Sequence, residues 1–158
     1  MSNIIDKYNV SVPRYTSYPP ANYVHELEAS DYLEAVVRSN EEGTKKLSFY
    51  LHMPFCKRLC HYCGCNSYIM PSSGDTVAKY IDAIHKEIDI VTTHIDKSRP
   101  ISQIHFGGGS PTAMPSSVLK EINEHLLSLF PTIDKPEIAI ECNPGYLTEE
   151  DWINLTNS

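Results

Sequence analysis

The chain has 158 residues, of which 41% are hydrophobic and 21% charged, and its formal net charge is -7. This composition is ordinary for one globular domain with a real core. Lys and Arg are scattered rather than clustered, which argues against nucleic acid as the main partner. No apolar run approaches the roughly 18 residues of a membrane span, and the start lacks a signal-peptide pattern. We therefore expect a cytoplasmic protein with no membrane partner, whose thiols stay reduced.

Residues 1–44 are predicted to form an amino-terminal arm. Residues 1 to about 25 are rich in Tyr, Pro and Ser and are expected to be ordered but irregular. Ser30 is a candidate helix cap, and the helix is expected to end by Gly43. The side chains predicted to point inward are Tyr32, Leu33, Val36 and Val37.

Residues 45–158 are predicted to form three successive strand–loop–helix units. The first strand, LSFYLHM, alternates apolar side chains with polar ones, so that Tyr50 and His52 share a polar face. Its apolar face consists of Leu47, Phe49, Leu51 and Met53. The three strands are predicted at residues 47–53, 101–106 and 137–141.

Helices are predicted after each of these strands. The first carries apolar side chains from Val77 to Ile95 at helical spacing, and the second from Val118 to Leu129. An acid-rich start at Thr148–Asp151 marks a third helix, with Trp152 and Leu155 on its apolar face.

This order of elements predicts an α/β fold with right-handed crossovers and a parallel sheet. In such sheets the chemistry lies at the carboxyl ends of the strands. A cysteine-rich loop follows the first strand, the run Gly107–Gly109 follows the second, and Glu141 ends the third. We therefore expect these three features to meet at one edge of the sheet.

The cysteine loop, CKRLCHYCGCN from Cys56 to Asn66, holds four of the five cysteines of the chain. In a reducing compartment such bunching is typical of a metal or cluster site rather than of disulfides. Soft thiolates in one compact loop suit an iron–sulfur cluster. A structural zinc site remains an alternative, with Cys65 or His61 as the fourth ligand. The spacing C-x3-C-x2-C resembles that of radical S-adenosylmethionine (SAM) enzymes.

We assign the predicted cluster to Cys56, Cys60 and Cys63. If the backbone is extended beyond Cys63, we expect the Cys65 side chain to point away, which leaves Cys65 outside the cluster. A spare buried thiol is the simple interpretation of Cys65. His52 and His61 are expected to be structural or surface histidines rather than ligands.

Other candidate binding residues have simple structural alternatives. Glycines between a strand and a helix let a ligand approach the backbone, although a tight turn explains GGGSP equally well. Glu141 could hold ribose hydroxyls or an ammonium group, or could be a solvated surface residue. Tyr50 and Tyr62 could bind a ligand or simply pack.

Three stretches together resemble the oxygen-independent coproporphyrinogen III oxidase family: PRYTSYP, FYLHMPFCKRLCHYCGCN and HFGGGSPT. The resemblance implies a partial radical-SAM barrel, of which residues 45–158 would be about the first three of six units. It also implies a [4Fe-4S] cluster held by three cysteines, with one open iron that binds SAM, and a second SAM molecule. Members of this family carry Cys at the position of Cys65, where a related heme chaperone typically has Phe.

The resemblance also implies roles for the candidate residues. Tyr50, Gly108 and Glu141 look like contacts to the SAM that binds the cluster. Tyr62, Gly109 and Ser110 look like contacts to the second SAM. The implied reaction is the anaerobic oxidative decarboxylation of coproporphyrinogen III to protoporphyrinogen IX.

The implied partners are the coproporphyrinogen III substrate and an electron donor of the flavodoxin or ferredoxin type. The alternative of a heme-chaperone paralogue is disfavoured by Cys65 and by PRYTSYP. Family members are more than twice this length, so we expect the chain to be an inactive fragment. The resemblance assigns no catalytic residue in it.

Overall fold

The computed structural model describes residues 3–4, 7, 9, 23–72 and 74–157. The chain divides into two compact units, residues 1–32 and 33–158. The described residues of the first unit are exposed to solvent. The PRYTSYP motif, residues 13–19, lies outside the described residues. The predicted domain boundary after residue 44 stays a prediction.

The predicted amino-terminal helix is present as α2 (Ala29–Glu42), but Ser30 is not its cap. The helix begins at Ala29, one residue before Ser30, so Ser30 lies within its first turn. The carboxylate of Asp31 accepts a hydrogen bond from the Glu28 backbone N–H at 3.1 Å. An acidic side chain in the first turn is favourable there because it meets the unpaired N–H groups of the helix start.

The predicted apolar face of α2 is only partly covered. Tyr32 and Val37 are each 50% exposed, so the expectation that they point inward was wrong. The polar carboxyl end of the helix provides the specific contacts instead. The Asn40 side-chain amide donates to the His94 carbonyl oxygen at 2.9 Å, and its oxygen accepts from the Asp96 N–H at 2.9 Å. Hydrogen bonds rather than apolar burial therefore fasten this end of the helix.

The predicted parallel sheet is present, with the strand order β1-β4-β5. Its strands are β1 (Leu47–Met53), β4 (Ile101–Gly108) and β5 (Thr132–Ile140). β4 runs further than predicted, into the glycine run, and β5 begins earlier than predicted. Pro136 lies in β5 where the register with β4 is irregular, a position that tolerates the missing N–H group.

Two short strands that the sequence did not predict close the cysteine loop. They are β2 (Phe55–Cys56) and β3 (Tyr68–Ile69), and they pair in parallel. The Tyr68 N–H donates to the Pro54 carbonyl oxygen at 2.7 Å, and the Met70 N–H donates to that of Cys56 at 2.8 Å. The two ends of the loop are thus tied together by backbone hydrogen bonds.

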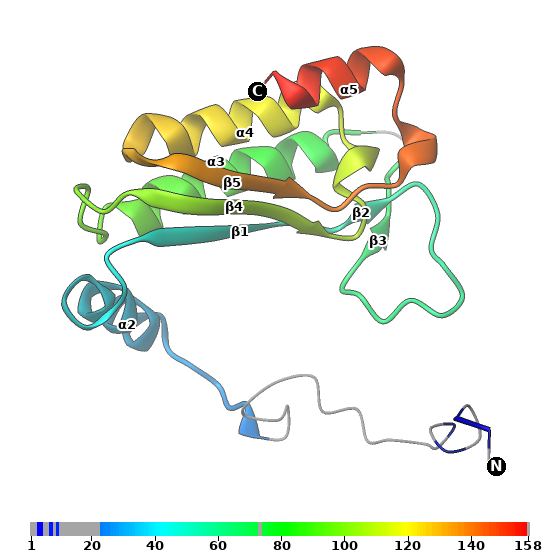
Figure 1. Cartoon of the computed structure of the whole chain (residues 1–158). Helices are drawn as coiled ribbons and strands as arrows, with labels where there is room; N and C mark the ends of the chain where they lie inside the picture. Colours follow the sequence, from blue (N-terminus) through cyan, green and yellow to red (C-terminus); the bar gives the residue numbers. More distant parts are fainter. Residues whose placement is uncertain (1–2, 5–6, 8, 10–22, 73, 158) are drawn as a thin grey trace. The chain divides into compact units, whose positions relative to one another are not determined.

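Three helices cover one face of the sheet (Figure 1). They are α3 (Thr76–Thr92), α4 (Ser116–Leu129) and α5 (Glu149–Thr156). Two short 3-10 turns, η2 (Pro111–Ala113) and η3 (Pro144–Tyr146), follow β4 and β5. The predicted start of α5 is confirmed, because Thr148 and Asp151 form a reciprocal capping box. No helix in the described part of the chain is long and apolar enough to cross a membrane.

The core lies between the sheet and these helices. Side chains from β1, β4 and α4 are fully buried there, and each contributes roughly 1.5–3 kcal/mol to the free energy of unfolding. The largest of them are Met53, Ile101, Ile104, Ile122 and Leu126. The apolar faces predicted for β1, α3 and α4 all contribute to this core. Helices α3, α4 and α5 lie on this side of the sheet and leave its polar face uncovered by them (Figure 1).

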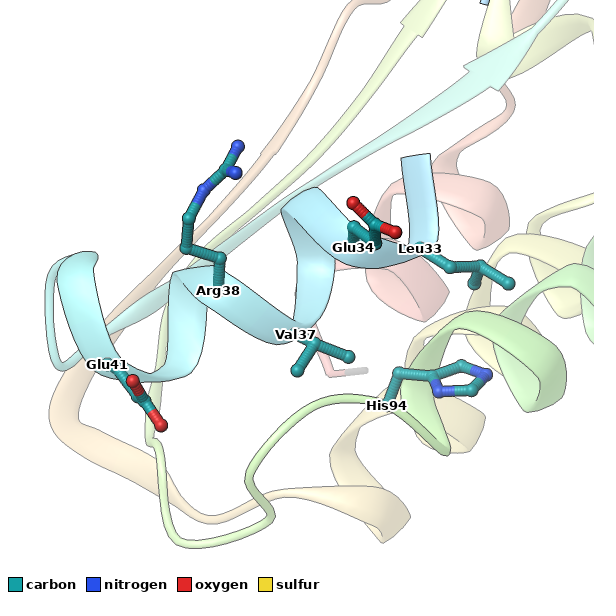
Figure 2. A pocket seen from close by; sticks show the side chains of 6 residues that line it. All are labelled: Leu33, Glu34, Val37, Arg38, Glu41 and His94. Carbon is teal, nitrogen blue, oxygen red and sulfur yellow. The ribbon is translucent and has the colours of Figure 1, made fainter. Parts of the chain in front are cut away.

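A surface cavity of about 490 Å³ lies beside α2, away from the carboxyl ends of the strands. Figure 2 shows its lining, in which apolar side chains of α2 lie beside a histidine from the segment after α3. The lining residues are Leu33, Glu34, Val37, Arg38, Glu41 and His94.

Candidate functional site

Glu141 and the glycine run meet at the carboxyl edge of the sheet, as the sequence predicted. Glu141 directly follows β5, and its backbone N–H donates to the Phe106 carbonyl oxygen of β4 at 2.9 Å. Its side-chain Oε2 accepts from the Gly108 N–H at 3.1 Å. Its Oε1 lies 3.4 Å from His105 Nε2. The carboxylate is thus fixed over the end of β4 rather than free in solvent.

Tyr50 lies beside this carboxylate, on the predicted polar face of β1. Its ring stacks on His105 with centroids 5.8 Å apart, and its hydroxyl lies 3.1 Å from His52 Nδ1. A Cβ atom at Gly107 would lie 2.8 Å from the Tyr50 ring and 3.0 Å from Glu141 Oε1. Glycine at this position therefore lets the aromatic ring and the carboxylate come together over the backbone.

Partial desolvation, then the charges of Glu141 and Cys65, raise the pKa of the Tyr50 hydroxyl above its ordinary value. The hydroxyl therefore keeps its proton at neutral pH and can donate a hydrogen bond.

The first cysteine is packed against the third glycine. The Gly109 N–H donates to the Met53 carbonyl oxygen at 2.8 Å, and the Ser110 N–H donates to that of Phe55 at 3.1 Å. A Cβ atom at Gly109 would lie 2.9 Å from Cys56 Sγ and 2.9 Å from the Pro54 carbonyl group. Glycine is thus required at position 109 for the cysteine loop to lie against the end of β4.

Gly108 has a φ angle of +120°, a backbone conformation that side chains with a Cβ atom rarely adopt. A Cβ atom there would also lie 2.8 Å from the His52 ring and 3.0 Å from the Met53 carbonyl oxygen. The glycine run is therefore more than a turn, because it brings β4 close to both β1 and the cysteine loop.

The remaining cysteines lie on the exposed part of the loop. Cys60 and Cys63 are exposed and joined by a turn, in which the Cys63 N–H donates to the Cys60 carbonyl oxygen at 3.1 Å. His52 fixes the return of the loop, because its Nε2 lies 2.8 Å from the Asn66 carbonyl oxygen. This contact agrees with the structural role expected for His52. The side chain of Tyr62 is 92% exposed, which contradicts the packing alternative for this tyrosine.

Two expectations about Cys65 were wrong. The thiol is exposed rather than buried, and it lies within hydrogen-bonding reach of the Cys63 thiol rather than pointing away from it. Residues two apart share one side of an extended segment, and this segment also bends. Hydrogen bonds from the Cys65 backbone and thiol lower the pKa of Cys63, while the pKa of Cys65 is raised chiefly by its bond to Cys63.

The donor set fits an iron–sulfur cluster. Cys56, Cys60 and Cys63 are all free of disulfides, and an all-thiolate set is what such clusters use. Within the described ranges, no three Cys, His, Asp or Glu side chains converge closely enough to hold a single metal ion.

The polar face of the sheet continues the site away from the edge. A hollow of about 260 Å³ lies over β1, β4 and β5. Its lining residues are Ser48, Phe49, Tyr50, Gln103, Ile104, His105 and Glu137. Sequence reasoning missed His105, although the alternation of ISQIHF places Gln103 and His105 on one face, as it does Tyr50 and His52 in β1.

The chain is similar to known proteins over nearly its whole length. The family model of the radical SAM superfamily matches residues 50–157. An oxygen-independent coproporphyrinogen III oxidase from Mannheimia haemolytica is 37% identical over 146 residues, and the match covers 89% of this chain and 94% of that protein. The chain belongs to the oxygen-independent coproporphyrinogen III oxidase family of the radical SAM superfamily.

Other members of this family are longer. The oxidase from Synechocystis is 37% identical over 153 residues, which are 96% of this chain and 32% of that protein. The solved structure of coproporphyrinogen III oxidase from Escherichia coli, described as a radical SAM enzyme, matches with a TM-score of 0.79 and 31% identity. That match covers 98% of this chain and 33% of the E. coli chain. The chain thus spans about a third of the length of these relatives.

These comparisons confirm the family resemblance and the α/β fold with parallel strands. A [4Fe-4S] cluster and SAM are the general cofactors of the superfamily, which supports the predicted cofactor classes. The roles of the individual site residues stay predictions.

Proposed function

We propose that this chain is the cluster-binding part of an enzyme that converts coproporphyrinogen III to protoporphyrinogen IX in heme biosynthesis without oxygen. The observation that carries the proposal is the packing of Cys56 against Gly109, beside the contact between Gly108 and Glu141. This packing unites a thiolate loop, a glycine edge and a fixed carboxylate. The names of the family members supply the substrate and the reaction.

Cys56, Cys60 and Cys63 would hold three irons of the cluster. When bound, the cluster supplies the electron that cleaves SAM. The chain orients the cysteine loop through the β2–β3 pairing and through the contact between His52 and Asn66. Cys56 is half-buried at the base of the loop.

The edge residues would bind SAM. Tyr50, Gly108 and Glu141 are proposed to contact the SAM at the cluster, and the fixed carboxylate suits an ammonium group or ribose hydroxyls. Tyr62, Gly109 and Ser110 are proposed to contact a second SAM. The exposed ring of Tyr62 is available for stacking from the solvent side of the loop.

The proposal includes an electron donor of the flavodoxin or ferredoxin type and excludes nucleic acid and membrane partners. A thiolate-held cluster needs a reducing compartment, which supports the cytoplasm. The match covers only about a third of the Synechocystis and E. coli proteins, which are therefore longer than this chain. We therefore propose that the 158 residues do not turn over substrate alone.

The test is anaerobic reconstitution of the chain with iron and sulfide. We expect a brown, oxygen-labile protein with about four irons per chain, as a cubane cluster requires, and a spectral change when SAM is added. Cys56→Ser should abolish iron binding, whereas Cys65→Ser should retain it. Equal loss in the two variants would contradict the three-ligand assignment.

Two further outcomes separate the parts of the proposal. A colourless preparation with one zinc per chain would contradict the cluster itself. Robust decarboxylation of coproporphyrinogen III by the reduced, SAM-supplied chain would leave the cluster intact but overturn the proposal that the chain is inactive alone.

A further inference from the structure

Two histidines face each other on the helix layer, away from the carboxyl edge of the sheet. His85 of α3 and His125 of α4 place their Nδ1 atoms 2.8 Å apart, the distance of an N–H···N hydrogen bond. Their ring planes differ by 30°. The two side chains are only 22% and 21% exposed. One proton between the rings therefore joins the two helices.

A carboxylate lies behind each ring. Asp89 Oδ1 is 3.0 Å from His125 Nε2, and Glu121 Oε1 is 3.6 Å from His85 Nε2. Asp89 lies one helical turn after His85, and Glu121 lies one turn before His125, so each helix supplies one histidine and one carboxylate. Each ring thus has a negative charge on the side that faces away from the other ring.

Two neutral imidazoles cannot satisfy all of these contacts. His125 needs its single proton on Nε2 to donate to Asp89, so the proton between the rings must come from His85 Nδ1. His85 Nε2 is then a bare acceptor that faces the Glu121 carboxylate. This buried nitrogen has no hydrogen-bond partner among the described residues, and an unmet buried polar atom lowers stability.

One additional proton satisfies every contact of the pair. Placed on His85 Nε2, it donates toward Glu121, while His85 Nδ1–H still donates to His125 Nδ1 and His125 Nε2–H to Asp89. The positive charge of the ring is met by two carboxylates, and charge-assisted hydrogen bonds are about twice as strong as neutral ones. A second additional proton does not fit, because both Nδ1 atoms would then carry hydrogen at 2.8 Å.

The surrounding charges also favour one positive charge at the pair. Asp82, which is exposed, lies one turn before the histidine of α3 on the same face of that helix. Lys97, from the segment after α3, interacts with Asp89. On α4, Lys120 and Glu124 pair with each other at 3.8 Å. Within the described residues, no charged side chain of α5 or of the sheet forms an ion pair with either histidine.

We propose that the folded chain holds one additional proton at the pair formed by His85 and His125, and that this proton makes the pair a pH-dependent clamp between α3 and α4. Loss of the proton leaves His85 Nε2 unpaired beside Glu121, and gain of another breaks the bond between the two rings. The clamp is therefore strongest in one window of pH and weakens on both sides of it. The proposal does not depend on the cysteine loop or on the proposed function.

Proton counting in the unfolded chain places this window. The two free imidazoles bind two additional protons in acid and none in alkali, and they hold one on average near the ordinary histidine pKa of about 6.5. Below that pH the unfolded chain binds more protons than the folded pair, so stability falls as the pH falls. Above it the unfolded chain binds fewer, so stability falls as the pH rises. The contribution of the pair thus has a maximum near pH 6.5.

The test compares thermal unfolding of the full 158-residue chain with that of a double variant, His85→Gln with His125→Gln. Circular dichroism is measured from pH 5 to pH 8 in a reducing buffer with a metal chelator. We expect the difference in Tm between wild type and variant to be largest near pH 6.5 and about 2–5 °C smaller at both ends. The matched control is His25→Gln, an exposed histidine outside the pair, which should show no such maximum.

Glu121→Gln separates the proton from simple packing. Its amide can donate to the bare His85 Nε2, so the neutral pair is satisfied and the loss of stability above pH 6.5 should disappear. A loss as large as in the wild type would overturn the proposal. So would a Tm difference that is constant with pH or changes in one direction only, or a maximum that His25→Gln also produces.

Nitrogen-15 NMR of the wild-type imidazoles gives an answer that needs no variant to fold. At pH 6.5 we expect three protons on the four ring nitrogens of the pair, with both Nε2 atoms protonated and one proton between the Nδ1 atoms. Only two protons at that pH, or hydrogen on both Nδ1 atoms, overturns the proposal.

Discussion

Gly109→Ala tests whether the glycine edge positions the cysteine loop. The added Cβ atom would meet Cys56 Sγ and the carbonyl carbon and oxygen of Pro54, each at 2.9 Å. Ordinary contacts are 3.4–4 Å, so these neighbours must move by several tenths of an ångström. Two of the three atoms belong to the backbone of a proline residue, which cannot rotate away as a flexible side chain could.

The expected cost follows from this crowding. An extra methyl group in a packed site destabilises by about 1–3 kcal/mol. For a chain of this size, each kcal/mol lowers Tm by about 2–4 °C, so we expect a loss of about 2–12 °C. Because Cys56 is one of the displaced neighbours, the variant should also hold less iron after reconstitution.

The assay is thermal unfolding of the metal-free chain by circular dichroism, followed by iron counting after anaerobic reconstitution. Gly64→Ala is the matched control, because Gly64 lies in the same loop and a Cβ atom there meets nothing within 4 Å. It should keep the wild-type Tm and iron content. A Gly109→Ala chain that melts within one degree of the wild type, or equal losses in both variants, would refute the packing argument.

Two further changes test other parts of the fold. Tyr80→Phe removes the 2.7 Å hydrogen bond from the half-buried hydroxyl to the His52 carbonyl oxygen. We expect the free energy of unfolding, measured in urea, to fall by about 0.5–1.5 kcal/mol. Unchanged stability would show that water replaces the bond. Asp151 has a pKa held below 3.8, first by the Thr148 backbone N–H and then by the Thr148 hydroxyl. A carboxylate with a lowered folded pKa stabilises fully above its unfolded pKa, and this contribution is lost as pH falls through the folded pKa. Asp151→Asn should therefore reduce the loss of stability below about pH 4, and an unchanged acid profile would count against the capping box.

The sequence predicted the elements whose side chains alternate or repeat over several turns. In β1, the pattern from Leu47 to Met53 is set by burial against the helices, so the period of two is visible in the sequence. The three-unit order then placed the cysteine loop, the glycine run and Glu141 at one edge, because parallel strands all end on the same side. Family, fold class and edge could thus be predicted without coordinates.

Features set by only a few residues were missed or wrong. β2 and β3 have two residues each, too few to show a period, and they form because the Pro54 and Cys56 carbonyls find donors across the loop. The side chain of Cys65 depends on a local bend, which spacing does not reveal. The exposure of Tyr32 reflects what covers α2, and helical periodicity cannot show this.

The position of the Glu141 carboxylate depends on the register between β4 and β5. Residues 103–106 of β4 pair regularly with residues 137–140, and the irregularity is confined to the opposite end of the strands. The regular pairing extends one residue beyond β5, where the Glu141 N–H donates to the Phe106 carbonyl oxygen. The Glu141 carboxylate can therefore accept the hydrogen bond from the Gly108 N–H. A slip of one residue would turn Glu141 toward the helix face and separate it from Tyr50. The bulge near Pro136 therefore absorbs the strand mismatch where no candidate site residue lies, and it leaves the end that carries the site in register.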